Sequence, residues 1–232
     1  VSENLAAFSG NNQRLRLFDL TNTAAPREIG TLSHPFREVG TTFMQWPYLY
    51  VGGAPYATGD NNTVELAIMD LRLPAPRHIV RTMTRGEIGF RGVHICICGN
   101  LMSVVAGGNA DGGALYDISD PVNPVLLSRP VIQRSYGGWM CGDMFFSGYQ
   151  VHDISDPTRP RLLSNANDNG YYPQFQKRRC FTKAFDRHSK LALRWVDMDT
   201  QQVNKIGLSS APGADIKVPI NTIGNETEMP VG

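Results

Sequence analysis

The residues best suited to binding or chemistry in this 232-residue chain are arginines, glutamates and aromatic residues in four short segments, residues 34–38, 85–91, 134–139 and 169–174. Such a mixture suits a polar or anionic small ligand, a sugar, or the side chains of a protein partner. Solvated loops with structural ion pairs, for example between the neighbours Arg37 and Glu38, would explain the same residues equally well. The candidate binding residues are Arg37, Glu38, Arg91, Arg134, Tyr136, Trp139, Tyr171 and Tyr172.

If the protein is an enzyme, His94 or Glu87 is the best candidate for a general base, and Arg91 is the best placed to hold an anion, with Arg37 and Arg134 as further candidates. A single histidine in a strand is, however, more often a hydrogen-bonded packing residue. The chain has no nucleophile elbow, zinc-protease motif or phosphate loop that would select a reaction. We therefore assign no catalytic residue.

We expect no metal and no cofactor. The five histidines share no spacing typical of a metal site. Three segments rich in Asp, Asn and Gly are typical of ordinary turns. The one that most resembles a calcium loop, residues 165–170, has Gln176 where a bidentate glutamate is needed. The four cysteines are too few for a disulfide scaffold, and we interpret them as reduced and buried.

The elements that must position these residues are repeats. The stretch Tyr116–Leu127, YDISDPVNPVLL, returns almost unchanged as His152–Leu163, HDISDPTRPRLL. Each copy consists of an apolar segment, a polar turn segment of Asp, Ser and Pro residues, and a second apolar segment. This order predicts a strand, a turn and a second strand.

Weaker copies of the repeat extend over most of the chain. Its first aspartate recurs as Asp19, Asp70, Asp117, Asp153 and Asp197, at spacings of 51, 47, 36 and 44 residues. These spacings lie around the period of a four-stranded propeller blade. Upstream of several aspartates a Gly-Asn or Gly-Asp pair separates two apolar runs, which predicts a tight hairpin.

We therefore predict an all-β fold, a β-propeller of four-stranded antiparallel blades in a single domain over residues 1–232. Residues 218–225 match 93–100 in their Val, Ile, Gly and Asn positions, so the C-terminal strand is expected to close a ring of five blades. The expected blades are residues 215–225 with 1–32, then 33–83, 84–129, 130–165 and 166–210. The alternative is a fragment of a six- or seven-bladed ring.

The motif Asp-Ile-Ser-Asp-Pro-x-x-Pro with an aliphatic run, preceded by Gly-Asn hairpins, resembles the LVIVD-repeat β-propeller proteins. The resemblance is most specific at 113–129 and 149–164. It implies a propeller of the kind often found on exported or cell-surface bacterial proteins, and it supplies no catalytic motif. Blade five departs from the motif because both prolines are missing after Asp197.

Charge and hydropathy limit the classes of partner. A net charge of +1 gives no reason to expect nucleic acid as a partner, and no apolar run approaches the length of a membrane span. We expect a non-enzymatic binding or scaffolding propeller, exported (periplasmic, cell-surface or extracellular) and able to form part of a larger complex. It would recognise a protein or glycan through the face that bears the variable loops. The alternative is a propeller enzyme, lyase-like or hydrolase-like, with a polar site at the mouth of the propeller's central channel.

Overall fold

The structure is a computed structural model. It describes the chain except for residues 1–3, 10–13, 54–58, 75–76, 92, 108–110, 134–136, 148–149, 166–170, 177–178, 186–190, 198–199, 201 and 208–232. After residue 163 it describes the backbone of the strands but, apart from Thr200, no side chains. The chain forms two compact units: residues 1–148 with 152–161, and residues 149–151 with 162–232.

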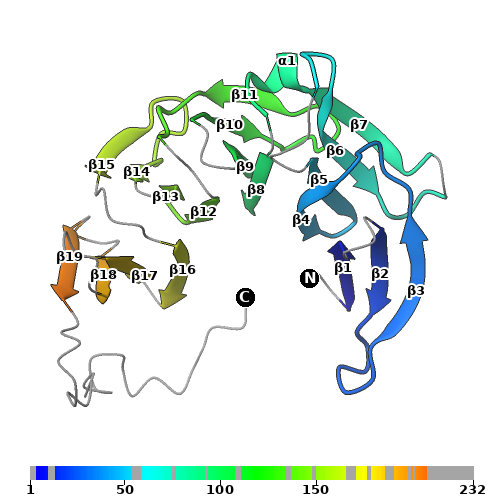
Figure 1. Ribbon diagram of the computed structural model, residues 1–232, viewed down its shortest axis with the longest axis horizontal. Helices are drawn as coiled ribbons and strands as arrows, with labels where there is room; N and C mark the ends of the chain where they lie inside the picture. Colours follow the sequence, from blue (N-terminus) through cyan, green and yellow to red (C-terminus); the bar gives the residue numbers. More distant parts are fainter. Residues whose placement is uncertain are drawn as a thin grey trace. The chain divides into compact units, whose positions relative to one another are not determined.

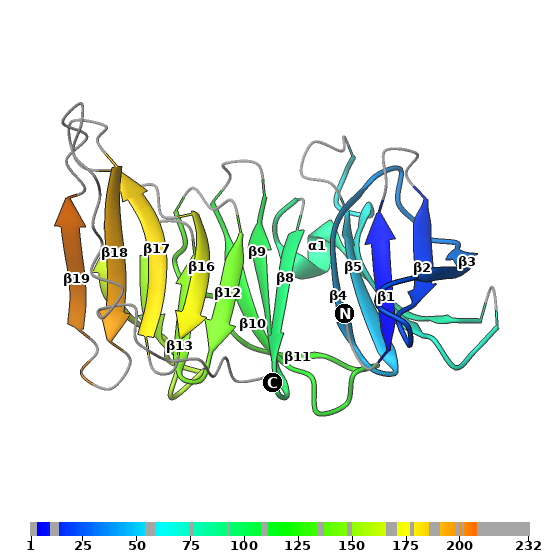
Figure 2. The same ribbon diagram turned by 90° about the horizontal axis from the view of Figure 1, so that it is seen from below.

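Five sheets follow one another along the chain, and within each sheet the strands pair in sequence order (Figure 1). The first three sheets are β1 (Leu5–Ser9), β2 (Leu15–Asp19) and β3 (Arg27–Leu32); β4 (Val39–Gln45), β5 (Tyr48–Gly53), β6 (Val64–Asp70) and β7 (Ile79–Thr84); and β8 (Val93–Cys98), β9 (Leu101–Ala106), β10 (Gly113–Asp117) and β11 (Val125–Ser128). The fourth is β12 (Gly138–Cys141), β13 (Met144–Ser147), β14 (Gln150–Asp153) and β15 (Arg161–Asn165). The fifth, shown in Figure 2, is β16 (Tyr171–Gln176), β17 (Arg179–Phe185), β18 (Leu191–Asp197) and β19 (Gln202–Gly207).

In the first unit the innermost strands pack against one another, because β4 contacts both β1 and β8, and β8 contacts β12. Three apolar clusters fill the spaces between successive sheets. The close approach has a residue-level cause at Gly52 of β5, where an added Cβ would lie 2.6 Å from the side chain of Val93. A larger residue there would push the second and third sheets apart.

The repeated aspartates stabilise the turns through hydrogen bonds to the backbone. In four sheets the carboxylate accepts a hydrogen bond from the backbone N–H two residues later, at 2.8–3.0 Å: Asp19 from Thr21, Asp70 from Arg72, Asp117 from Ser119 and Asp153 from Ser155. In the same four sheets the N–H of the intervening residue donates to a carbonyl of the neighbouring hairpin: Leu20 to Asn4, Leu71 to Pro47, Ile118 to Asn100 and Ile154 to Asp143. The motif therefore ties its own turn to the adjacent one, which is a structural role.

We expect Asp153→Ala to lower the free energy of unfolding by about 1–2 kcal/mol, the scale of a lost capping bond. Asp153 is only 8% exposed and also pairs with Arg161, whose Nη2 lies 2.9 Å from its Oδ2. Chemical denaturation would measure the loss. Asp143→Ala is the control, because Asp143 contributes its backbone carbonyl and its side chain is exposed. Equal losses in both variants would contradict this role.

The structure departs from the prediction at one connection and leaves one predicted strand undescribed. Residues 85–88 were expected to be loop, and they form α1 (Arg85–Ile88), a single helical turn. The predicted closing strand, within 215–225, lies outside the described residues. The first sheet accordingly shows three strands, whereas each of the other four sheets shows four.

Candidate functional site

The connections of the first unit divide between two ends of its sheets. Because neighbouring strands are antiparallel, the strand ends joined by the links β1–β2, β5–β6 and β9–β10 lie at one end, together with those joined by the links between successive sheets; this end is here called the loop face. The hairpin turns and the turns that carry the repeated aspartates lie at the other end, here called the turn face. Backbone hydrogen bonds join two loop-face connections: the N–H of Arg85 donates to Thr63 O, and the N–H of Gly86 donates to Asn61 O, each at 2.8 Å.

Helix α1 is stabilised at both of its ends. At its start the Glu87 carboxylate accepts the N–H of Thr84 at 2.7 Å, and the Thr84 hydroxyl accepts the N–H of Glu87, which is a capping box. At its end Gly89 adopts a φ of 93°, and its N–H donates to Arg85 O. Only glycine takes this left-handed conformation without strain, so the sequence Thr-Arg-Gly-Glu-Ile-Gly specifies one helical turn.

A buried ion pair anchors α1 to the second sheet. Both Nε and Nη2 of Arg85 donate to Glu65 Oε1, at 2.8 and 2.6 Å. Glu65, the second residue of β6, is 1% exposed, and Nη1 of Arg85 donates to the carbonyl of Gly59. The sequence prediction missed this pair. Its signal was a glutamate inside the apolar run Val64–Met69, where a charge needs a partner.

Glu87, one of the two candidates for a general base if the protein is an enzyme, is engaged in structural contacts. Its carboxylate accepts hydrogen bonds from the backbone of Thr84 and from Arg81 Nη2, the latter at 2.8 Å. The hydrogen bond from the Thr84 backbone is the main reason that the pKa of Glu87 lies below its usual value. The Arg129 guanidinium also donates to the carbonyls of Glu87 and Ile88, which caps the end of α1. To act as a base, this carboxylate would have to leave its partners.

His94 lies half-buried in β8, as predicted for an inner strand, and burial lowers its pKa. It is therefore neutral at pH 7. Arg91 is exposed in the link that leads to β8. Within the part of the chain that the structure describes, no hydrogen bond or ion pair joins His94, Glu87 and Arg91 to one another, so this trio stays a prediction.

The predicted binding residues fall into three groups. Arg37 is exposed and Glu38 half-exposed on the loop face, and among the described residues neither they nor Arg91 form an ion pair. Trp139 lies half-buried in β12, with its ring over Gly137, where an added Cβ would lie 2.8 Å from the ring. Four candidates cannot be placed: Arg134 and Tyr136 lie outside the described residues, and Tyr171 and Tyr172 belong to β16, whose side chains are not described.

Of the three described cysteines, Cys96 is buried as predicted, whereas Cys98 and Cys141 are partly exposed. Cys96 is 8% exposed, its Sγ accepts the N–H of Met140 at 3.3 Å, and burial raises its pKa. A thiol held in its protonated form is a poor nucleophile. Among the described residues no group of three or more His, Cys, Asp or Glu side chains could hold a metal ion.

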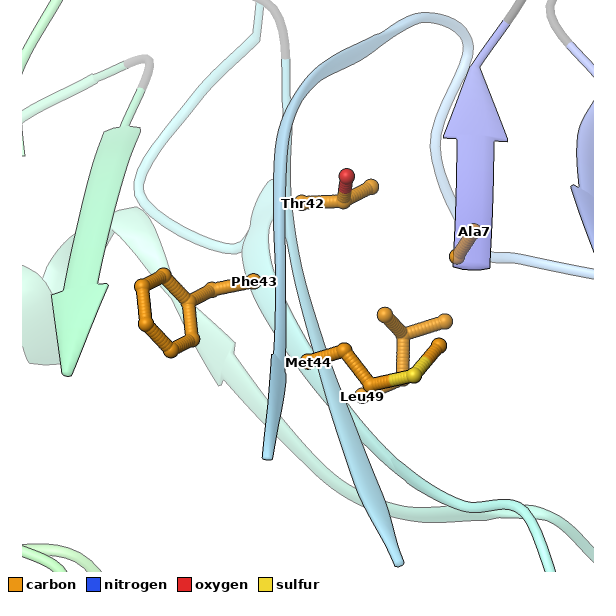
Figure 3. Close-up of a pocket in the computed structure, with 5 residues that line it drawn as sticks. All are labelled: Ala7, Thr42, Phe43, Met44 and Leu49. Carbon is orange, nitrogen blue, oxygen red and sulfur yellow. The ribbon is translucent and has the colours of Figure 1, made fainter. Parts of the chain in front are cut away.

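A small apolar recess of about 210 Å³ lies between β1 and β4 (Figure 3). It is lined by Ala7, Thr42, Phe43, Met44 and Leu49. With no charged or titratable lining residue, it can bind an apolar group but cannot perform acid–base chemistry.

The turn face carries an aromatic group that the sequence prediction did not select. Trp46 is 41% exposed in the β4–β5 turn. Arg72 lies over the ring of Tyr48, with 5.7 Å from Cζ to the ring centroid. Arg72 is also held by Asp70 through two hydrogen bonds, from Nε at 2.9 Å and from Nη2 at 2.7 Å.

No protein-family model matches the chain, and no curated protein matches it in sequence. Solved structures do resemble it. A proposed 6-phosphogluconolactonase from Bacteroides uniformis has a TM-score of 0.60 at 10% identity, over 88% of this chain and 67% of that one. The WD40 domain of Toxoplasma gondii coronin has a TM-score of 0.58 at 10% identity, over 90% and 57%. A chain of a nidogen–laminin complex has a TM-score of 0.52 at 7% identity, over 88% and 76%.

At these identities the likeness concerns the fold alone. WD40 domains are propellers whose blades have four strands, and the antiparallel sheets of this chain match that architecture. This confirms the predicted fold class. Among the described residues no helix has the length and apolar character to cross a membrane. The chain has the fold of a β-propeller.

Proposed function

We propose that the protein is a non-enzymatic binding or scaffolding propeller, exported or surface-associated, that recognises a protein or a glycan through its loop face. The observation that supports this most is the pair Arg37 and Arg91. Both are exposed on the loop face, and within the described part of the chain neither has an ion-pair partner. Membership of the LVIVD-repeat family and export stay predictions from the sequence.

Three other arginines of the first unit have structural partners. Arg81 pairs with Glu87, Arg85 pairs with Glu65, and Arg129 caps α1. These three contribute to the rigid scaffold, whereas Arg37 and Arg91 are available. A guanidinium offers five donors in a planar fork that fits carboxylate, phosphate and sulfate groups. We therefore expect an acidic protein surface or an acidic glycan as the recognised group.

The proposal predicts that Arg37→Glu combined with Arg91→Glu weakens partner binding by about tenfold or more, because two attractions become repulsions. A partner would first be captured from an extract of the source and identified by mass spectrometry. Its affinity for each purified variant would then be measured by calorimetry. An array of acidic and neutral glycans, probed with the same variants, tests the glycan form of the proposal.

The matched control is Arg77→Glu combined with Arg159→Glu. Both residues are exposed on the turn face, and this variant has the same change in net charge. We expect it to bind as the unmodified protein does. If both double variants lose affinity equally, the effect is one of net charge and the loop face is not the site.

A further inference from the structure

Three connections of the loop face are bonded to one another next to Arg91. The Arg129 guanidinium, in the connection that follows β11, donates to two backbone carbonyls of α1. The N–H of Gly112, in the connection between β9 and β10, donates to the carbonyl of Ile132 at 3.1 Å. These bonds hold together the connection that carries Arg91, the connection after β11 and the end of the connection before β10.

The Phe90 ring packs into the same junction. An added Cβ on Gly112 would lie 2.8 Å from the ring, so the ring lies directly against this backbone. Phe90 is half-buried, and the next residue, Arg91, is exposed without an ion-pair partner among the described residues. The packing of Phe90 therefore fixes the backbone from which the Arg91 side chain extends.

Val131 belongs to this junction and is 76% exposed, more than any other large apolar side chain in the described part of the chain. Its backbone is fixed on both sides. Arg129 caps α1, and Ile132 is 2% exposed in the apolar cluster between the third and fourth sheets. A branched side chain on a fixed backbone has few rotamers to lose, so its burial against a partner costs little conformational entropy.

The three residues Phe90, Arg91 and Val131 are here called the Val131 patch. Isolated apolar side chains on a protein surface are common and need no function. Val131 differs because it is held rigidly, at a junction that also carries a half-buried aromatic ring and an unpaired arginine. An apolar centre beside a charged rim is the composition of a protein–protein interface.

We propose that the Val131 patch binds a protein, through an apolar side chain that packs on Val131 and a nearby carboxylate that pairs with Arg91. The inference rests on the proposed function, because it takes the loop face as the binding surface, and it selects a protein over a glycan. A branched aliphatic side chain offers a sugar neither a hydrogen-bonding group nor a flat ring. Against a leucine or phenylalanine it removes apolar surface from water.

Phage display of random short peptides, with the full chain as bait, tests this proposal. We expect the enriched peptides to share a Leu, Ile, Phe or Trp with an Asp or Glu close to it in sequence. A dye-labelled synthetic copy of an enriched peptide would then be titrated with each purified variant by fluorescence anisotropy. Val131→Ser should weaken binding about fivefold or more, because the apolar side chain of the peptide loses its contact.

The matched control is Val125→Ser. Val125 is 60% exposed and is the first residue of β11, at the turn-face end of that strand, so the chemical change is the same at a different place. We expect this variant to bind the peptide as the unmodified protein does. Both serine variants should unfold at the temperature of the unmodified protein, because both valines are exposed.

Unchanged affinity in Val131→Ser, or failure to enrich peptides of the expected kind, would overturn this inference. If Arg37→Glu with Arg91→Glu still weakens binding in that case, the proposed function stands and only the patch is wrong. Unchanged affinity in the double variant as well would contradict the loop face itself. Binding of an acidic glycan from an array at equal strength to Val131→Ser and the unmodified protein, with no peptide enriched, would assign the site to a sugar.

Discussion

Arg85→Met should lower the free energy of unfolding of the first unit by about 3–5 kcal/mol, the scale measured when one partner of a buried ion pair is removed. Glu65 is 1% exposed, and the Arg85 side chain is 15% exposed. Without the guanidinium, the Glu65 carboxylate would be buried beside Gly53 and the Phe36 ring without this charged partner. Methionine keeps the length and helix propensity of the side chain, so the loss reports on the charge.

Urea denaturation of the purified protein measures this effect. The matched control is Arg81→Met, because Arg81 and Glu87 form a pair whose side chains are 41% and 42% exposed. An exposed pair contributes about 0–1 kcal/mol. Adding Glu65→Gln to Arg85→Met should restore part of the loss, because the buried charge is then gone. Similar losses for Arg85→Met and Arg81→Met would show that the Glu65–Arg85 pair is not buried as described.

Acidification should destabilise the fold through His152. This histidine is 3% exposed, its ring centroid lies 5.9 Å from that of Phe145, and burial lowers its pKa to about 4. The unfolded chain takes up the proton near pH 6.5, and the folded chain only near pH 4. The contribution of neutral His152 to the free energy of unfolding is therefore complete above pH 6.5. It is lost as the pH falls toward 4, which lowers the free energy of unfolding by about 3 kcal/mol in total.

The test is the unfolding free energy measured at several pH values between 7 and 4. His152→Tyr is a suitable variant because Tyr116 holds the equivalent position in the preceding repeat. It should have a smaller loss of stability over this range than the unmodified protein. The remainder belongs in part to His94, whose pKa is lowered by burial in the same direction. An unchanged pH dependence would contradict the burial of His152.

The fold could be predicted because the repeat is local. The Asp-Ile-Ser-Asp-Pro stretch specifies a turn through bonds between residues two apart, and the same bonds recur at Asp19, Asp70, Asp117 and Asp153. Such contacts can be predicted from the sequence because they join residues that are close together in the chain. The strand order within each sheet then follows from short connections between antiparallel neighbours.

The roles of the loop-face side chains could not be predicted from the sequence because they depend on contacts between distant residues. Glu87 was a candidate base only if the protein is an enzyme, and its hydrogen bonds to Thr84 and Arg81 give it a helix-capping role. Arg85 finds Glu65 twenty residues away in the chain. The placement of β6 and α1 gives Arg85 its ion-pair partner, whereas among the described residues Arg37 and Arg91 have none.

The central claim is that the loop face, and not the turn face, meets the partner. Hydrogen exchange of the protein alone and in complex with its captured partner tests this most directly. We expect slower exchange on binding in residues 33–38 and 85–91. Protection confined to residues 46–48 and 71–73, around Trp46 and Arg72 on the turn face, would contradict it.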